Sequence, residues 1–285
     1  MNKKKGGFDK FINKTTKKRK SFEPKTDSTD KKFKKKTTKS KSPKPSGDGL
    51  IRLNKFLADA GICSRREADK LIESGAVTIN GKVVIQLGTK VSRTDKVIYG
   101  DQLLRAEKLQ YIMLNKPKGY ITTSDDPQDR KIVMTLVQNA CKERIYPVGR
   151  LDRNTTGLLL FTNDGDLAKK LTHPKHGVKK LYHVVLDKPL TKNHLLEIAA
   201  GIKLEDGEIR PDKIAYDKNA ADKREIGIEL HSGRNRIVRR VFEHLGYRVE
   251  KLDRVMFASL TKKDIPRGKW RSLTEKEVNM LKMLP

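Results

Sequence analysis

The chain changes character abruptly near residue 48, and this break limits what can fold. Residues 1–48 consist mainly of Lys, Ser, Thr, Pro and Gly. Their larger apolar side chains are Phe8, Phe11, Ile12, Phe22 and Phe33. So little apolar surface cannot offset the entropy lost on ordering, so we predict a disordered tail. Such a tail either keeps the protein soluble or captures phosphates at long reach, and its composition does not decide between the two.

The charge indicates the kind of partner. The formal net charge is +29, of which residues 1–48 carry +13 and the remaining residues +16. Because the part expected to fold is itself basic, the whole protein should attract polyanions. Nucleic acid is favoured over an acidic membrane surface.

The cysteines and the apolar runs indicate the compartment. Cys63 and Cys141 are the only cysteines, and their spacing fits neither a metal site nor a redox motif. No apolar stretch approaches the roughly 18 residues of a membrane span, and no signal-peptide core follows the first lysines. The tail is rich in Lys and contains acids, which is not typical of an organelle transit peptide. We therefore expect a reducing, cytoplasmic location.

Residues 49–108 are predicted to form a small domain with its connector. Leu53 and Leu57 fall at helical spacing, and Gly61 is a typical helix end. Ser64 and Glu67 have the spacing of a capping box, which opens a second helix. The segment 76–84 then predicts two strands joined by an Asn-Gly turn. The result is a helix–turn–helix followed by a hairpin.

This small domain has basic residues where stability alone would not place them. Arg65 and Arg66 lie in the first turn of the second helix, where cations oppose the helix dipole at a cost of about 0.3–1 kcal/mol each. The same helix end has free N–H groups that suit a phosphate. Together with Arg52, Lys55 and Lys70 they predict an RNA-binding face. The alternative is a charged surface with no partner.

Residues 109–285 are predicted to form a larger α+β domain with a mixed or antiparallel sheet, since strands and helices alternate without a βαβ repeat. The predicted strands are 110–117, 119–124, 156–162, 179–187 and 224–231. The predicted helices are 131–138, 164–171, 190–201 and 235–246. Asp164 and Thr191 are the expected caps of two of these helices, and Gly246 is the expected end of the last.

One carboxylate in this domain has an unusual setting. Asp152 lies in GRLDRNTTGLLLF, between Arg150 and Arg153 and before a run of leucines. Burial raises the pKa of an aspartate by about 3–5 units, and a nearby guanidinium lowers it again by about 1–3 units. Arg239 borders the apolar stripe of helix 235–246, from which it could reach a carboxylate. The residues alone leave two readings open, a shielded nucleophile and a structural ion pair.

Two stretches resemble known families. RLNKFLADAGICSRREADKLIESGAVTINGK is similar to an S4-type RNA-binding domain. GRLDRNTTGLLLFTNDGDLAKKLTHP resembles the signature of pseudouridine synthases of the RsuA/RluB/RluF type, with KLY at 180–182 and GRNRIVRRVFEHLG as two further elements. The order of the two domains is also that of this family, and the large-subunit RluB-like members are the most similar.

The resemblance implies roles for individual residues. Asp152 would be the nucleophile, Tyr182 would stack on the target base with a possible role in proton transfer, and Arg239 would form an ion pair with Asp152. If Arg240 faced the pocket instead, the motif alignment would be off by one residue. Phosphates would be held by the following residues: Arg52, Lys55, Arg65, Arg66, Lys70, Arg150, Arg153, Lys180, Arg234 and Arg236.

The reaction implied is the conversion of uridine to pseudouridine in ribosomal RNA, and the family likeness favours the RNA of the large subunit. It needs no cofactor and no metal, and His173 and His176 are expected to be an ordinary loop pair. The partner would be ribosomal RNA or an assembly intermediate, with the protein acting as a monomer away from membranes. The alternative from another class is a non-catalytic RNA-binding assembly factor. A glycoside hydrolase would need a second carboxylate beside Asp152.

Overall fold

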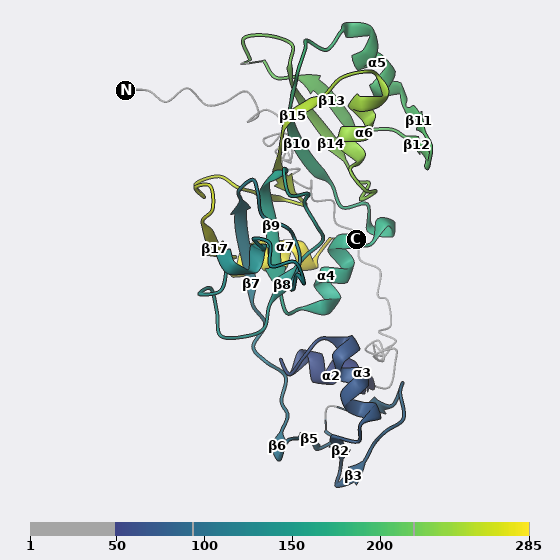
Figure 1. Cartoon of the computed structure of the whole chain (residues 1–285), viewed down its shortest axis with the longest axis vertical. Helices are drawn as coiled ribbons and strands as arrows, with labels where there is room; N and C mark the ends of the chain where they lie inside the picture. Colours follow the sequence, from purple (N-terminus) through teal and green to yellow (C-terminus); the bar gives the residue numbers. More distant parts are fainter. Residues whose placement is uncertain (1–48, 93, 219, 285) are drawn as a thin grey trace, which may run out of the picture. The chain divides into compact units, whose positions relative to one another are not determined.

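The structure is a computed structural model that describes residues 49–284 except 93 and 219. The predicted disordered tail lies outside the described residues. The chain divides into two compact units, one holding residues 64–104 and the segment up to Leu57, the other holding 58–63 and everything from Arg105 onward (Figure 1). Among the described residues, no helix is both long and apolar enough to cross a membrane.

The smaller unit consists of two helices and short strands. Helix α2 is Leu53–Asp59 and helix α3 is Arg65–Glu73. The predicted capping box is confirmed: Ser64 Oγ accepts from the backbone N–H of Glu67, whose carboxylate accepts from the backbone N–H of Ser64. Buried Leu53, Leu57 and Ile72 form part of its core.

The strands of this unit form two small sheets. In the four-stranded sheet the order is β3-β2-β5-β6. Its strands are β2 (Val77–Ile79), β3 (Lys82–Val83), β5 (Val97–Tyr99) and β6 (Gln102–Leu103). The other sheet pairs β1 (Ile51–Arg52) with β4 (Lys90–Val91). Asn80 and Gly81 both have positive φ, as the predicted turn between β2 and β3 requires.

The larger unit is built on a nine-stranded mixed sheet with the order β13-β14-β10-β15-β9-β7-β17, in which β16 adds to β15 and β8 adds to β9. Every pairing is antiparallel except that of β9 with β15. The strands are β7 (Tyr111–Lys116), β8 (Tyr146–Pro147), β9 (Thr156–Thr162), β10 (Lys180–Leu186), β13 (Lys213–Tyr216), β14 (Glu225–Leu230), β15 (Val249–Phe257), β16 (Leu260–Thr261) and β17 (Trp270–Ser272). The predicted mixed-sheet α+β architecture is therefore confirmed.

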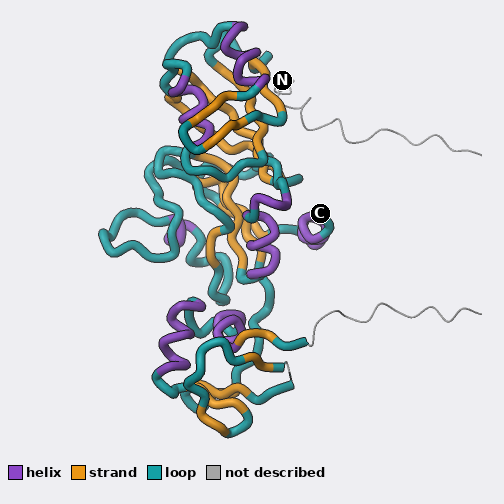
Figure 2. The backbone as a smooth tube through the Cα atoms, turned by 90° about the vertical axis from the view of Figure 1, so that its right-hand side faces the viewer, coloured by secondary structure: helices purple, strands orange, loops and turns teal. Residues whose placement is uncertain are grey.

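Helices cover this sheet in two groups, which Figure 2 shows lying beside the strands. Helices α5 (Lys192–Ala200) and α6 (Ile237–His244) pack on the half formed by β10, β13, β14 and β15, together with the small hairpin β11 (Ile202–Leu204) and β12 (Gly207–Ile209). Helices α4 (Gly165–Thr172) and α7 (Glu275–Lys282) pack on the other half. The apolar stripe of α6 is buried as predicted.

Two predicted elements are wrong. The strand expected at 119–124 is a single bridge between Ile121 and Ile132, because the Thr122 hydroxyl bonds to the backbone of Leu151 and holds this segment as a loop. The helix expected at 131–138 is one 3₁₀ turn, Val133–Leu136. The β-branched pair Ile132 and Val133 at its start disfavours a longer helix.

Candidate active site

The larger unit contains a cavity of about 520 Å³, and Asp152 lies in its wall. Four segments that are far apart in the sequence meet there: the loop 148–155, strand β10, the loop 232–238 before and into α6, and strand β15. Asp152 is the only carboxylate among the lining residues. Six lining residues are cationic: Arg150, Arg153, Lys180, Arg234, Arg236 and Arg254. A glycoside hydrolase would need a second carboxylate, so this composition does not fit that class.

A buried lysine holds the loop that carries Asp152. Lys116, the last residue of β7, is 0 % exposed. Its Nζ donates to the backbone carbonyls of Asp152 at 3.1 Å and Thr155 at 2.9 Å, and also reaches Arg153 at 3.4 Å. Burial lowers the pKa of Lys116 to about 8, while the charge of Asp152 opposes this shift. Sequence reasoning missed this residue, although a lysine ending a strongly apolar strand was a visible signal.

A glycine allows β9 and β15 to approach closely behind the same loop. Gly157 has φ +109°, and a Cβ placed there would lie 2.3 Å from the backbone oxygen of Arg254. Only glycine combines this conformation with so close an approach. Gly157, the last residue of the GRLDRNTTG motif, thus allows the parallel pairing of β9 with β15. This pairing positions the end of the Asp152 loop.

Tyr182 lies in the cavity wall beside a buried arginine. It faces Arg254 across the pairing of β10 with β15. Arg254 is 3 % exposed, and its Nε donates to the carbonyl of Leu158 at 2.8 Å. Burial lowers the pKa of Arg254, and a hydrogen bond with Tyr182 partly opposes this. Its guanidinium lies 4.7 Å from the ring centre of Phe257. Arg254 is a second cavity residue that sequence reasoning missed.

Arg239 is buried, but the ion pair expected between it and Asp152 does not form in the structure. Among the ion pairs of the described residues none joins these two side chains, and Arg239 Nη1 donates to the carbonyl of Val249 at 2.8 Å. Burial and the charge of Arg236 lower the pKa of Arg239, whereas the charge of Asp152 raises it. The two residues therefore interact through space without a direct bond. Arg240 points to Asp206 and does not line the cavity.

The cations predicted to hold phosphates differ in their exposure and in the partners that they bond to. Arg150 and Arg153 are exposed at the cavity, and Arg236 is exposed with an ion pair to Glu243 at 3.3 Å. Lys180 is half-buried and donates to the carbonyls of Val178 and His231, both at 2.9 Å. Burial and the charge of Arg254 lower the pKa of Lys180 to about 8.

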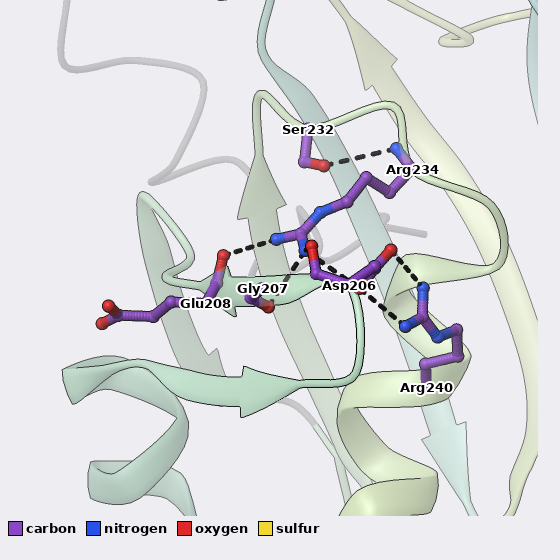
Figure 3. A network of polar contacts seen from close by, with 6 residues as sticks. All are labelled: Asp206, Gly207, Glu208, Ser232, Arg234 and Arg240. Carbon is purple, nitrogen blue, oxygen red and sulfur yellow. Dashed lines mark hydrogen bonds and ion pairs between the residues drawn. The ribbon is translucent and has the colours of Figure 1, made fainter.

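Arg234 also lines the cavity, but its guanidinium is turned to the β11–β12 hairpin (Figure 3). It donates to the carboxylate of Asp206 and to three backbone carbonyls of residues 206–208. A phosphate contact from Arg234 would have to replace these bonds.

The predicted basic face of the smaller unit keeps most of its residues in solvent. Arg52, Arg65, Arg66 and Lys70 are exposed, and Lys55 is half-buried. The Asn54 amide donates to Asp69 at 2.8 Å and its oxygen accepts from Arg65 at 3.4 Å, which ties α2 to α3.

The histidines expected to form a loop pair lie at the end of α4. The ring centres of His173 and His176 are 6.1 Å apart, and His173 Nδ1 accepts from the backbone N–H of Lys175. Because this nitrogen already accepts a hydrogen bond, it is not available as a metal ligand. One group with metal-type ligands does occur in the described residues, His183 with Asp217 and Glu225, outside the cavity lining.

Comparisons with known proteins agree with this architecture. The family model described as RNA pseudouridylate synthase matches residues 110–244, and the S4 domain model matches residues 51–97. Ribosomal large subunit pseudouridine synthase B of Bacillus subtilis is 42 % identical over 238 residues, which cover 82 % of this chain and 97 % of that protein. This chain belongs to the RNA pseudouridine synthase family.

Two further pseudouridine synthases support the assignment. The dual-specificity RNA pseudouridine synthase RluF of Escherichia coli (strain K12) is 36 % identical over 241 residues, covering 83 % of this chain and 80 % of that protein. A crystal structure of a pseudouridylate synthase matches with a TM-score of 0.58 and 33 % identity over 81 % of this chain and 99 % of that one. The predicted family, with its S4 domain ahead of the synthase domain, is confirmed.

Proposed function

We propose that this pseudouridine synthase acts on large-subunit ribosomal RNA, with Asp152 as its nucleophile. The observation that carries the proposal is the position of Asp152, which is the one carboxylate among the described residues of a cavity wall that also holds six cationic residues, with its loop anchored on buried Lys116. The 42 % identity to a ribosomal large subunit pseudouridine synthase over nearly that protein's whole length supports the substrate.

The proposed reaction is an isomerisation. The N1–C1′ bond of the uridine breaks, the uracil turns, and C5 bonds to C1′, while the C5 proton is lost and N1 gains one. Atoms and electrons balance without a cofactor. Asp152 contributes covalent catalysis, which divides a difficult step into easier ones. Arg239 supports its charge through space, and an RNA-bound state is where their expected ion pair would form.

The target base must leave its stack to reach Asp152, at a cost of a few kcal/mol. Stacking on an aromatic side chain returns about 1–3 kcal/mol, and Tyr182 in the cavity wall is the residue we assign to this. Arg150, Arg153, Lys180 and Arg236 are the cations we assign to the phosphates around the flipped nucleotide.

The remaining residues have proposed roles away from the cavity. The basic face of the smaller unit, 49–108, docks structured RNA, while 109–285 carries out the chemistry. We further propose that the protein works as a monomer in the cytoplasm. The proposed location rests on the two cysteines, Cys63 and Cys141, whose spacing in the sequence fits neither a metal site nor a redox motif. Sedimentation of the purified protein tests the monomer.

Replacing Asp152 with Asn tests the chemistry. The variant keeps the side-chain shape but removes the nucleophile, so it should form no pseudouridine while its affinity for ribosomal RNA stays within about threefold, since phosphate contacts dominate affinity. The measurement is nucleotide-resolution mapping of pseudouridine in unmodified ribosomal RNA incubated with each protein.

The outcomes separate the candidate functions. Pseudouridine at one position with the unaltered protein and none with the D152N variant supports the proposal. Turnover by D152N would remove Asp152 from the mechanism. Tight RNA binding without any turnover by the unaltered protein would support the non-catalytic assembly factor instead.

A further inference from the structure

The β11–β12 hairpin ends in an acidic turn that lies against the cavity loop. Asp206 occupies this turn, between Arg234 and Arg240 (Figure 3). Its Oδ1 accepts from Arg240 Nη2 at 2.7 Å and from Arg234 Nη1 at 3.0 Å, and its Oδ2 accepts from Arg240 Nη1 at 2.8 Å. Arg240 thus donates to both carboxylate oxygens through its two terminal nitrogens. This bidentate geometry fixes the orientation of the two side chains relative to each other.

Arg234 extends this contact to the backbone of the hairpin. Its Nη1 donates to the carbonyls of Asp206 and Gly207, both at 3.0 Å, and its Nη2 donates to that of Glu208 at 2.6 Å. The loop that carries Arg234 supplies residues 232–236 to the cavity wall. The hairpin turn therefore holds a segment of the cavity wall, residues 232–236, that is far from Asp152 in the sequence.

The helix that follows this loop depends on the same carboxylate. Helix α6 begins after Arg236, which has φ +46°, a conformation that costs a non-glycine residue about 1–2 kcal/mol. No side chain caps this end of α6. Arg240 lies in the first turns of α6, so its bond to Asp206 fixes the start of the helix that also carries buried Arg239.

From these contacts we propose that Asp206 is a positioning residue for the pseudouridine synthase reaction, and this rests on the proposed function. It holds loop 231–236 and the start of α6 in the place that shapes the cavity, although it does not line the cavity itself. Arg234 and Arg240 accordingly act on the hairpin and not on RNA phosphates. The hydrogen bond from Arg240, the largest effect, lowers the pKa of Asp206 to about 2, so the carboxylate is ionised at neutral pH.

The test compares D206N with D222N in the full-length protein. Asp222 is a matched control, because it too pairs with an arginine, Arg224 at 2.7 Å, and is about as exposed. Its partner Arg224 belongs to no segment that lines the cavity, whereas Arg234 and the start of the helix that carries Arg240 do line it. Turnover number, KM and the salt dependence of binding are measured on an unmodified ribosomal RNA fragment. Because displacement of a site by about 1 Å costs about 100-fold in rate, we expect D206N to lose about 10- to 100-fold in kcat with KM changed less than threefold. D222N should match the unaltered protein.

Several results would overturn the proposal. One is an unchanged kcat for D206N. Another is tighter RNA binding with a steeper salt dependence and full turnover, which would mean that Asp206 merely occupies a phosphate site. If D206N does not fold by circular dichroism, R240M gives the second measurement, and the same selective loss of kcat is expected. An unaltered protein that makes no pseudouridine would instead defeat the proposed function, so the two failures are distinguishable.

Discussion

At the scale of single residues, the cavity has one carboxylate in its wall, and the described residues in and behind that wall include buried cations that bond to backbone carbonyls and form no ion pair within 4 Å. Burial lowers the pKa of Lys116, Arg239 and Arg254, and the charge of Asp152 counteracts this for the first two. A cation taken out of water without a direct ion pair is costly. Retaining such cations around one loop is understandable if the site must receive negative charge, first that of Asp152 and then that of RNA.

Replacing Lys116 with Met tests whether the lysine serves the Asp152 loop. The methionine fills similar space but leaves the carbonyls of Asp152 and Thr155 without their donor, so the loop should shift. We expect kcat to fall about 100-fold, as for a displaced catalytic group, with RNA affinity within threefold. Turnover and filter binding measure the two effects.

K170M is the control for this substitution, since Lys170 also donates to a carbonyl, that of Lys282, but outside the cavity. It should leave turnover unchanged. Wild-type turnover by K116M would show that the anchoring bonds do not matter to catalysis.

At the scale of elements, the site depends on how strands far apart in the sequence are paired. The helices were predictable because their signals are local: Ser64, Asp164 and Thr191 each cap the helix expected after them. The β11–β12 hairpin and the parallel pairing of β9 with β15 were not, since both depend on contacts across the fold. For the same reason the motif located Asp152 and Tyr182, while Arg254 and Asp206 became visible only in three dimensions. Lys116 had a signal in the sequence, but its contact with the Asp152 loop depends on the fold.

Replacing Gly157 with Ala tests the close approach of β9 and β15. The added methyl group would meet the Arg254 backbone, and φ +109° is strained for alanine, so strands β9 and β15 would have to separate. Backbone strain of this kind costs about 1–3 kcal/mol, and overpacking adds about as much again. We expect a fall of several degrees or more in the melting temperature, measured by calorimetry.

G246A is informative beside it. Gly246 also has a positive φ, but nothing lies within 4 Å of the position of its Cβ. The G246A variant should therefore be destabilised only by the backbone strain of alanine at a positive φ. If G157A were no less stable than G246A, the close approach would not be what requires glycine at residue 157.

At the scale of the whole molecule, basic residues occur in both units as well as in the tail. The folded part alone carries +16. Since each phosphate contact releases counterions, the number of cations that touch RNA can be counted from the salt dependence of binding, independently of catalysis. The contribution of each unit to RNA binding can therefore be measured separately, by substituting cations in one unit at a time.

Replacing both Arg65 and Arg66 with Gln tests the face of the smaller unit. These exposed side chains lie in the first turn of α3, where cations oppose the helix dipole, although Arg65 also donates to Asn54 at 3.4 Å. We expect weaker binding and a salt dependence reduced by about 1–2 in slope, with kcat at saturating RNA unchanged, because the cavity is untouched. The double variant K192Q/K276Q removes two exposed charges from α5 and α7 and should bind normally. If both double variants lost the same affinity, the effect would come from net charge, and the small domain would have no docking face of its own.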